Sequence, residues 1–258
     1  MSAEANVGAQ GASGPDVSSM LTRVGAITGR ELAGLFFSPI AYVVIAIFLV
    51  VTGIFFAWQT FQPGQEATLR NLLDNMPLIM VFILPMLTMR LMSDEYRSGT
   101  IESLMTAPVT DLDVILGKFA GVFLFYIVML VTTIPYWAMV GLYGDTDIGG
   151  TVTGYFGLLL LGSMYLSVGL FFSTCTRNQV IAVLCSFVLL ALFTFLAQFL
   201  GSRMEGTLRV VVQYLSIVSH YQDFARGMVV LNDVVFFLSN TIFFVFLAVK
   251  VLESRRWR

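Results

Sequence analysis

The sequence has little charge, one histidine and only two cysteines. Charged residues make up 12% of its 258 residues, about half the proportion of soluble domains. His220 is the single histidine, so the chain lacks the ligands of a typical histidine-based metal site. Cys175 and Cys185 lie close to or within apolar runs, where cysteine behaves as a small hydrophobic residue. We therefore expect neither a disulfide nor a metal centre.

Nucleotide-binding and hydrolytic motifs are also missing. Gly117-Lys118 is followed by Phe119 and lacks the upstream glycine of a P-loop, so we do not expect the chain to hold a nucleoside triphosphate. It has no G-x-S-x-G and no H-E-x-x-H pattern. The formal net charge of -2 argues against a nucleic-acid partner, which requires a basic stripe. These absences predict a chain that is not an enzyme and binds no cofactor itself.

Long apolar runs dominate what is present. The chain is 57% hydrophobic, with a mean hydropathy of +0.86. Runs of about 20 apolar residues are long enough to cross roughly 30 Å of hydrocarbon. We predict an all-α integral membrane protein with six transmembrane helices, at about 39–58, 76–92, 119–143, 155–174, 180–200 and 233–252. Pro85 is expected to kink the second of them.

The remaining segments have distinct compositions. Residues 1–17 are small and polar and predict a disordered tail, which leaves 18–258 as the membrane domain. Residues 18–38 space their apolar side chains helically and predict an amphipathic helix along the inner membrane surface. Residues 201–232 mix apolar and polar side chains, which predicts short outer-leaflet helices. Small residues in the fourth span predict close helix packing: Gly154, Gly157, Gly162, Ser163, Ser167 and Gly169.

Basic residues set the expected orientation. When both termini are placed inside, ten of the 14 Lys and Arg residues fall in inner segments. Positive charge accumulates on the cytoplasmic side of membrane proteins. Both termini are therefore predicted to be cytoplasmic.

The densest polar stretch on the inner side runs from residue 90 to residue 118, between the second and third predicted spans. Gly99 is placed to act as the N-cap of a short helix, with Glu102 at N3 as half of a capping box. Pro108 disfavours helix at the preceding residue, so this helix has at most two turns. The stretch is therefore predicted to contain a short, well-defined helix.

A second helix start follows at Thr110-x-x-Asp113 and leads into the third span. The short helix would then be held between two spans and display these charged residues: Asp94, Glu95, Arg97 and Glu102. Such a charged knob suits docking into a groove on a cytoplasmic protein and transmitting its movement. Two plainer alternatives stay open, a solvated connection and, for Lys118, an ordinary interfacial lysine.

This stretch resembles a family signature. The run from Asp94 to Leu104, then Ala107-Pro108-Val109 and Ile115-Leu116-Gly117-Lys118, is similar to the E-x-x-x-G-T-x-E-x-L…P-x…L-G-K pattern of ABC-2 type permeases. Residues 219–227 and 252–257 resemble the gliding-motility (GldF-like) subgroup. The resemblance covers about residues 20–258. It implies six spans, an N-terminal amphipathic connecting helix, a cytoplasmic coupling helix and a homodimer, each copy docked on a separate ATPase subunit that binds ATP and Mg.

The resemblance also assigns roles to residues. It implies a coupling region that contacts the ATPase: Asp94, Glu95, Arg97, Gly99, Thr100, Glu102, Leu104, Pro108 and Lys118. The subgroup implies an auxiliary membrane protein with a periplasmic domain, for which we expect contacts at His220, Asp223 and Arg226. The implied function is substrate export or conformational work across the bacterial inner membrane, driven by the ATPase.

Three rival functions stay open. One is a subunit that relays ATPase motion to a periplasmic partner without moving a substrate. Another is a scaffold that has no ATPase partner, and the third is a membrane-embedded enzyme. The enzyme is disfavoured because the spans contain no convincing polar catalytic group.

Overall fold

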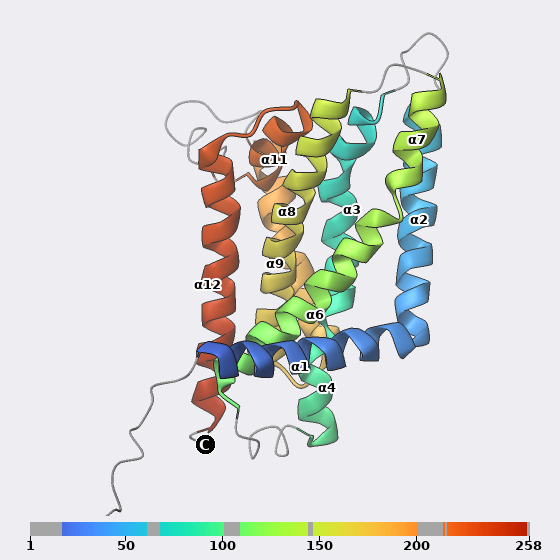
Figure 1. The fold of residues 1–258 in the computed structure, drawn as a ribbon. Helices are drawn as coiled ribbons and strands as arrows, with labels where there is room; N and C mark the ends of the chain where they lie inside the picture. The colour runs from blue at the N-terminus through green and yellow to red at the C-terminus, as the bar shows by residue number, and fades with distance from the viewer. Residues whose placement is uncertain are drawn as a thin grey trace, which may run out of the picture.

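The computed structural model describes residues 17–60, 68–100, 109–143, 147–200, 214 and 216–256. All regular structure within these ranges is helical, which confirms the all-α class for that part of the chain. Most helices stand side by side in a bundle (Figure 1). Helix α1 (Val17–Phe37) crosses one end of the bundle and the short helix α11 (Ile217–Ala225) lies at the other. The predicted tail lies outside the described residues except for Val17, which begins α1.

Five segments of the described chain are long and apolar enough to cross a membrane. They are α2 (Pro39–Thr60), α3 with α4 (Arg70–Thr88 and Arg90–Ser98), α6 with α7 (Asp111–Val131 and Ile134–Tyr143), α8 (Ile148–Cys175) and α12 (Leu231–Arg256). Helix α9 (Gln179–Leu200) occupies the remaining predicted span, and Gln179–Phe195 within it is a shorter apolar helix. Five spans are thus supported and the sixth stays a prediction.

The second and third spans are longer than the sequence predicted. The second begins at Arg70 rather than near 76, and the third begins at Asp111 rather than near 119. The predicted boundaries stopped at polar and charged residues. Helical hydrogen bonding continues through these residues because their polar side chains either reach water, as Arg70 does, or are paired within the protein, as Asp113 and Lys118 are.

Helix α8 is the centre of the bundle and contacts six other helices: α3, α4, α6, α9, α11 and α12. Its glycines make this possible. A Cβ atom on Gly162 would collide with the ring of Tyr126, and one on Gly169 would collide with Thr88. Small residues therefore let neighbouring backbones approach α8 closely, as the sequence predicted for this span.

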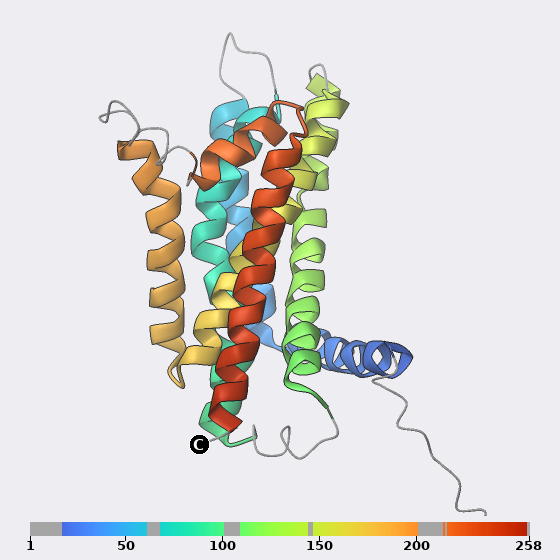
Figure 2. The ribbon, with the colours of Figure 1, turned by 90° about the vertical axis from the view of Figure 1, so that its left-hand side faces the viewer.

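Helix α1 lies across the base of α6, nearly perpendicular to the bundle (Figures 1 and 2). Its partly buried positions come in pairs, at 23–24, 27–28, 31–32 and 35–36, and the positions between these pairs are exposed. This is the period of one helix face. The chain from Val17 to Phe37 is thus a helix with one packed face, which contacts α6 and α2. Its place along the inner membrane surface stays a prediction.

Candidate functional site

Three helices meet at Lys118, at the end of the bundle that α1 crosses. The Lys118 ammonium lies 2.6 Å from Glu31 Oε1 on α1 and 2.7 Å from Glu95 Oε1 on α4. Lys118 itself belongs to α6 and is only 2% exposed. Lysine and glutamate are rarely buried unless they are paired. The cluster of Glu31, Lys118 and Glu95, hereafter the lysine cluster, therefore ties α1, α4 and α6 to one another.

Two glycines of α6, Gly117 and Gly121, leave a notch in its surface that brings α1 within reach of Lys118. A Cβ atom on Gly117 would lie 2.6 Å from Ile27 Cβ, and one on Gly121 would lie 2.8 Å from Glu31 Cβ. The Thr28 hydroxyl also lies 3.2 Å from the Gly117 carbonyl, which accepts its hydrogen bond. Two glycines one turn apart thus allow the backbones of α1 and α6 to approach, and this approach positions Glu31 beside Lys118.

A second ion pair joins α1 to the first turn of α6. Arg23 Nε lies 2.9 Å from Asp113 Oδ2. Asp113 also completes a capping box, because its carboxylate accepts from the Thr110 backbone N–H and its own N–H donates to Thr110 Oγ1. The predicted helix start at Thr110 and Asp113 is confirmed. The same carboxylate starts α6 and anchors α1.

The second span is broken between α3 and α4, and Ser173 of α8 enters the break. Its hydroxyl donates to the Met89 carbonyl at 3.0 Å and accepts from the Ser93 N–H at 3.3 Å. In an uninterrupted helix, that carbonyl and that N–H would bond to each other. A side chain inserted into the ladder is a recognised cause of helix bending. The break lies one turn beyond Pro85, where the kink was predicted.

The structure corrects the predicted loop between the second and third spans. Residues Arg90–Ser98 form α4, a continuation of the second span. Glu95 is not displayed to solvent, because it turns inward to Lys118 and its side chain is 16% exposed. Arg97 is exposed, as expected. Asp94 contacts the side-chain amide of Gln179 on α9.

Gly99 also has a role other than the predicted one. It is the C-cap of α4, with φ 75° and ψ 1°, a left-handed conformation that glycine adopts without strain. An N-cap residue has extended backbone instead, so the N-cap prediction is wrong. Thr100 Oγ1 lies 2.9 Å from Ser98 Oγ just after this turn. The other predicted coupling residues, Glu102, Leu104 and Pro108, lie outside the described residues.

The opposite end of the bundle is built differently, around His220 on α11. Its Nδ1 lies 2.6 Å from Asp233 Oδ1 on α12, and its Nε2 lies 2.9 Å from the Tyr214 carbonyl. Its ring stacks on Phe236, with centroids 4.2 Å apart. His220 is 7% exposed and therefore offers little surface to the partner that the sequence assigned to it. Burial also raises the pKa of the neighbouring Tyr221 hydroxyl well above its ordinary value, so this phenol stays neutral.

The other two residues predicted to contact a partner remain accessible. Asp223 and Arg226 form a loose pair, 3.7 Å apart, with side chains that are 32% and 50% exposed. They lie where α11 ends, just before Gly227, which has φ 86°. Thr153 of α8 holds this turn by donating to the Phe224 carbonyl at 2.9 Å. The segment therefore presents a charged surface from a fixed backbone.

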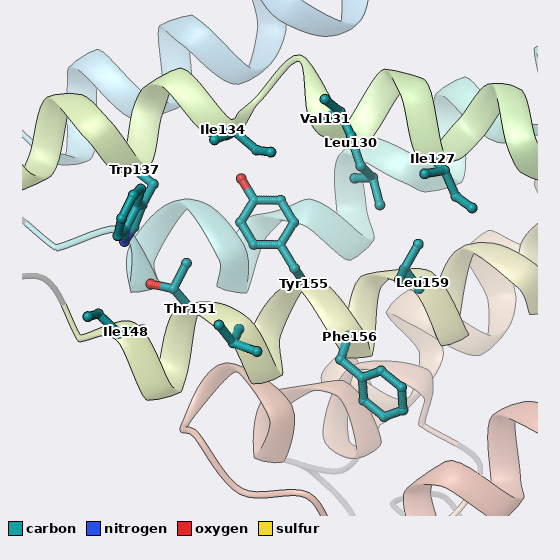
Figure 3. A pocket seen from close by; sticks show the side chains of 11 residues that line it. Ile127, Leu130, Val131, Ile134, Trp137, Ile148, Thr151, Tyr155, Phe156 and Leu159 are labelled. Atoms are coloured by element: carbon teal, nitrogen blue, oxygen red, sulfur yellow. The ribbon is translucent and has the colours of Figure 1, made fainter.

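An apolar groove of about 540 Å³ runs along α6, α7 and α8 (Figure 3). Its walls are almost entirely hydrocarbon, and Tyr155 points across it to the break between α6 and α7, where its hydroxyl lies 2.8 Å from Thr133 Oγ1. Trp137 Nε1 is buried nearby and has no partner among the described residues. The groove suits hydrocarbon chains, whether these come from lipid or from a substrate.

Sequence reasoning missed several residues of these clusters: Arg23, Glu31, Ser173 and Asp233. A signal existed for two of them. Arg23 and Glu31 are eight residues apart, so both lie on the packed face of an amphipathic helix. Charges on that face require buried partners. No comparable pattern marks Ser173, whose role depends on a helix break in another segment.

A family model described as ABC-2 family transporter protein matches residues 33–191. A search of curated proteins finds no match. The family match covers α2 to most of α9, including Glu95, Lys118 and the break at Met89, whereas Arg23 and Glu31 precede it.

Proposed function

The chain belongs to the ABC-2 family of transporter proteins and is a membrane permease subunit of an ABC transporter, a membership that implies an ABC ATPase subunit as its partner. We propose that this permease converts the motion of that ATPase into movement of its spans through the lysine cluster. The observation that carries the proposal is the burial of Lys118 between Glu31 and Glu95, one from each of two other helices.

The position of the cluster in the chain supports this role. The segment between Gly99 and Val109 connects the C-cap of α4 to the N-cap of α6 at Thr110. A push on this segment acts on both helices together. Glu95 lies one turn before its start, and Lys118 lies two turns after its end. The cluster would thus pass the push to α1 as well, and Arg23–Asp113 would keep α1 aligned with α6.

The break at Met89 gives α4 room to respond. The backbone link between α3 and α4 is weakened there, because Ser173 replaces the direct bond between Met89 and Ser93. Bending α4 relative to α3 at this point would not break a direct Met89–Ser93 backbone hydrogen bond, because the Ser173 hydroxyl already takes its place. We propose that α4 tilts about this break when the ATPase pushes on the segment beyond Gly99.

The proposed assembly follows the family resemblance. Two copies form a homodimer in the bacterial inner membrane, with both termini in the cytoplasm. Two ATPase subunits bind ATP and Mg and dock on the segment after Gly99. The work is export of a lipid-linked or glycan substrate, and the apolar groove beside Tyr155 suits the hydrocarbon part of a lipid-linked molecule.

A second function, favoured by α8, is relay of ATPase motion to a periplasmic protein, as in the GldF-like subgroup. Helix α8 contacts α4 at Ser173 and contacts α11 at Thr153, near its other end. Its 28 residues extend roughly 42 Å at 1.5 Å per residue. A displacement of α4 would thus reach the exposed pair Asp223 and Arg226, which we propose as the contact for an auxiliary membrane protein.

The test separates docking from coupling. Wild type, Glu102→Lys and Lys118→Met would be purified from native membranes in mild detergent, with partners identified by mass spectrometry and ATP hydrolysis measured after reconstitution. The Lys118→Met complex should retain its ATPase but lose the dependence of hydrolysis on the permease. Glu102→Lys should lose the ATPase altogether. Lys250→Met is the matched control, because Lys250 is the only other lysine and is exposed.

Two results would contradict the proposal. If no ATPase accompanies the wild type, the transporter function is wrong and the scaffold reading takes its place. If Lys118→Met hydrolyses ATP with unchanged dependence on the permease, the lysine cluster is not the linkage. An auxiliary periplasmic protein that is lost from Asp223→Lys, with the ATPase retained, would favour the relay function.

A further inference from the structure

A cleft of about 270 Å³ opens beside the lysine cluster, between α1, α2, α3 and α4. One wall is apolar and includes Ile40, Val44 and Met86. The other wall carries charged side chains: Glu31, Arg90, Asp94, Glu95 and Lys118. The cleft therefore joins a hydrocarbon surface to a polar one, at the end of the bundle where α1 lies across the spans.

Two side-chain atoms in this cleft, one on a cationic and one on an anionic group, have no partner among the described residues. Arg90 Nε is a buried donor, and Glu95 Oε2 is a buried acceptor. They do not bond to each other, and the Lys118 ammonium is already held by Glu31 Oε1 and Glu95 Oε1. A buried polar group without a partner is costly. A ligand that supplies one acceptor and one donor would satisfy both groups.

The surroundings indicate a phospholipid. Ile40 and Met86 are 38% and 40% exposed, so the apolar wall opens sideways to where acyl chains lie. Helix α1 has the amphipathic character of a helix in the plane of the headgroups. Basic residues at this level bind lipid phosphates, and the guanidinium of Arg90 suits a phosphate oxygen.

The charge balance selects the headgroup. The lining has three carboxylates and two cationic side chains, so a headgroup with net negative charge is disfavoured. Glu95 Oε2 needs a hydrogen-bond donor, which a primary ammonium has and a trimethylammonium lacks. We propose that this cleft binds phosphatidylethanolamine, with its phosphate at Arg90 and its ammonium at Glu95. This binding goes beyond the proposed coupling and does not depend on it.

The first test changes the lipid and leaves the protein intact. The full-length chain in detergent would be titrated with dioleoyl phosphatidylethanolamine, its N-methyl and N,N-dimethyl derivatives, phosphatidylcholine and phosphatidylglycerol, and bound lipid counted by native mass spectrometry. Affinity should fall as methyl groups replace N–H donors. Phosphatidylethanolamine should bind about tenfold more tightly than phosphatidylcholine, the effect of one hydrogen bond to a charged group.

Two outcomes of this titration would overturn the proposal. Equal affinity along the methylation series would mean that the cleft holds ordinary surrounding lipid. Tightest binding of phosphatidylglycerol would make it a site for anionic headgroups instead. Each result is obtained with wild-type protein, so neither depends on whether a variant folds.

A pair of variants then locates the site. Arg90→Met should weaken the binding of phosphatidylethanolamine and of phosphatidylcholine alike, by about tenfold, because both lipids carry the phosphate. Arg97→Met is the control, because Arg97 is on the same helix but exposed and outside the cleft. The lipid-free midpoint of thermal unfolding checks that both variants fold. If folded Arg90→Met binds phosphatidylethanolamine as tightly as wild type, the headgroup does not lie at Arg90.

Discussion

The two ends of the bundle hold their helices together by different chemistry. At the α1 end, helices distant in sequence are joined by ion pairs, between Lys118, Glu31 and Glu95 and between Arg23 and Asp113. At the α11 end, one His220–Asp233 pair is enclosed by aromatic rings, and the short helix is seated on α8. The first end relies on charge, and the second relies mainly on packing.

The difference bears on how each end can move. Ion pairs tolerate small changes of geometry because the Coulomb energy varies gradually with distance. The attraction in aromatic stacking and close backbone contact falls by about a quarter to a half over a gap of roughly 0.5–1 Å. We therefore expect the α1 end to shift while its pairs persist, and the α11 end to move as a rigid unit with α8 and α12.

The largest expected effect is on the ion-paired end. Lys118→Met leaves the partly buried Glu31 and Glu95 near each other without a cation, and removing one member of a buried ion pair costs up to about 3–5 kcal/mol. Unfolding in detergent, followed by intrinsic fluorescence against temperature, measures the loss. Lys250→Met should change the stability by less than about 0.5 kcal/mol. Equal midpoints for the two variants would show that the cluster contributes nothing to stability.

The second-largest loss of stability is expected at the α11 end. His220→Ala leaves the Asp233 carboxylate buried without its partner, which costs about 3 kcal/mol, near the top of the range for an unpaired buried group. The same unfolding measurement applies. Asp223→Asn, on the same helix but half-exposed and only loosely paired, should leave the stability nearly unchanged. If His220→Ala leaves the stability unchanged, the remaining packing alone holds α11 in place.

A smaller effect tests the notch between α1 and α6. Gly117→Ala forces a methyl group against Ile27 and the Val24 carbonyl, and overpacking of this kind costs about 1–3 kcal/mol. Gly25→Ala on α1 meets nothing within 4 Å, so it should raise the stability by up to about 1 kcal/mol through helix propensity. If both variants behave alike, α1 does not dock closely on α6.

The smallest expected effect concerns the break in the second span. Ser173→Ala removes the hydroxyl that bonds to Met89 and Ser93, at a cost of about 1 kcal/mol. Its effect on coupled ATP hydrolysis should exceed its effect on stability if α4 tilts at this point. Ser239→Ala, on the exposed side of α12 and bonded only within its own helix, controls for loss of a hydroxyl. Unchanged coupling in Ser173→Ala would argue against the tilt.

Local patterns in the sequence predicted the elements well. The 3.6-residue spacing in 18–38 predicted α1, Thr110 and Asp113 predicted the start of α6, and the small residues of α8 predicted its close packing. Each of these depends on residues within a few turns of one another. The exact ends of the spans could be predicted less well, because polar residues at a membrane boundary are compatible with both helix and loop.

Such local patterns could not predict the lysine cluster or the His220 site. Lys118 lies 87 residues from Glu31, and no local signal states which acidic residue faces it. Glu95 was expected at the surface because charged residues usually are exposed. Only the meeting of α1, α4 and α6 shows that Glu95 and Glu31 share one buried cation. Only the packing of α11 against α12 shows that His220 faces Asp233.

The docking of α1 on Gly117 and Lys118 also determines when the protein can assemble. Helix α1 ends at Phe37, so about 80 residues must still be synthesised before Lys118 exists, roughly 4–16 s at 5–20 residues per second. During that time α1 carries three glycines, Gly25, Gly29 and Gly34, which weaken a free helix and at which an added Cβ atom would meet nothing within 4 Å even in the finished fold. Helix α1 thus leaves the ribosome before α6 and can reach its final place only after α6 has been made.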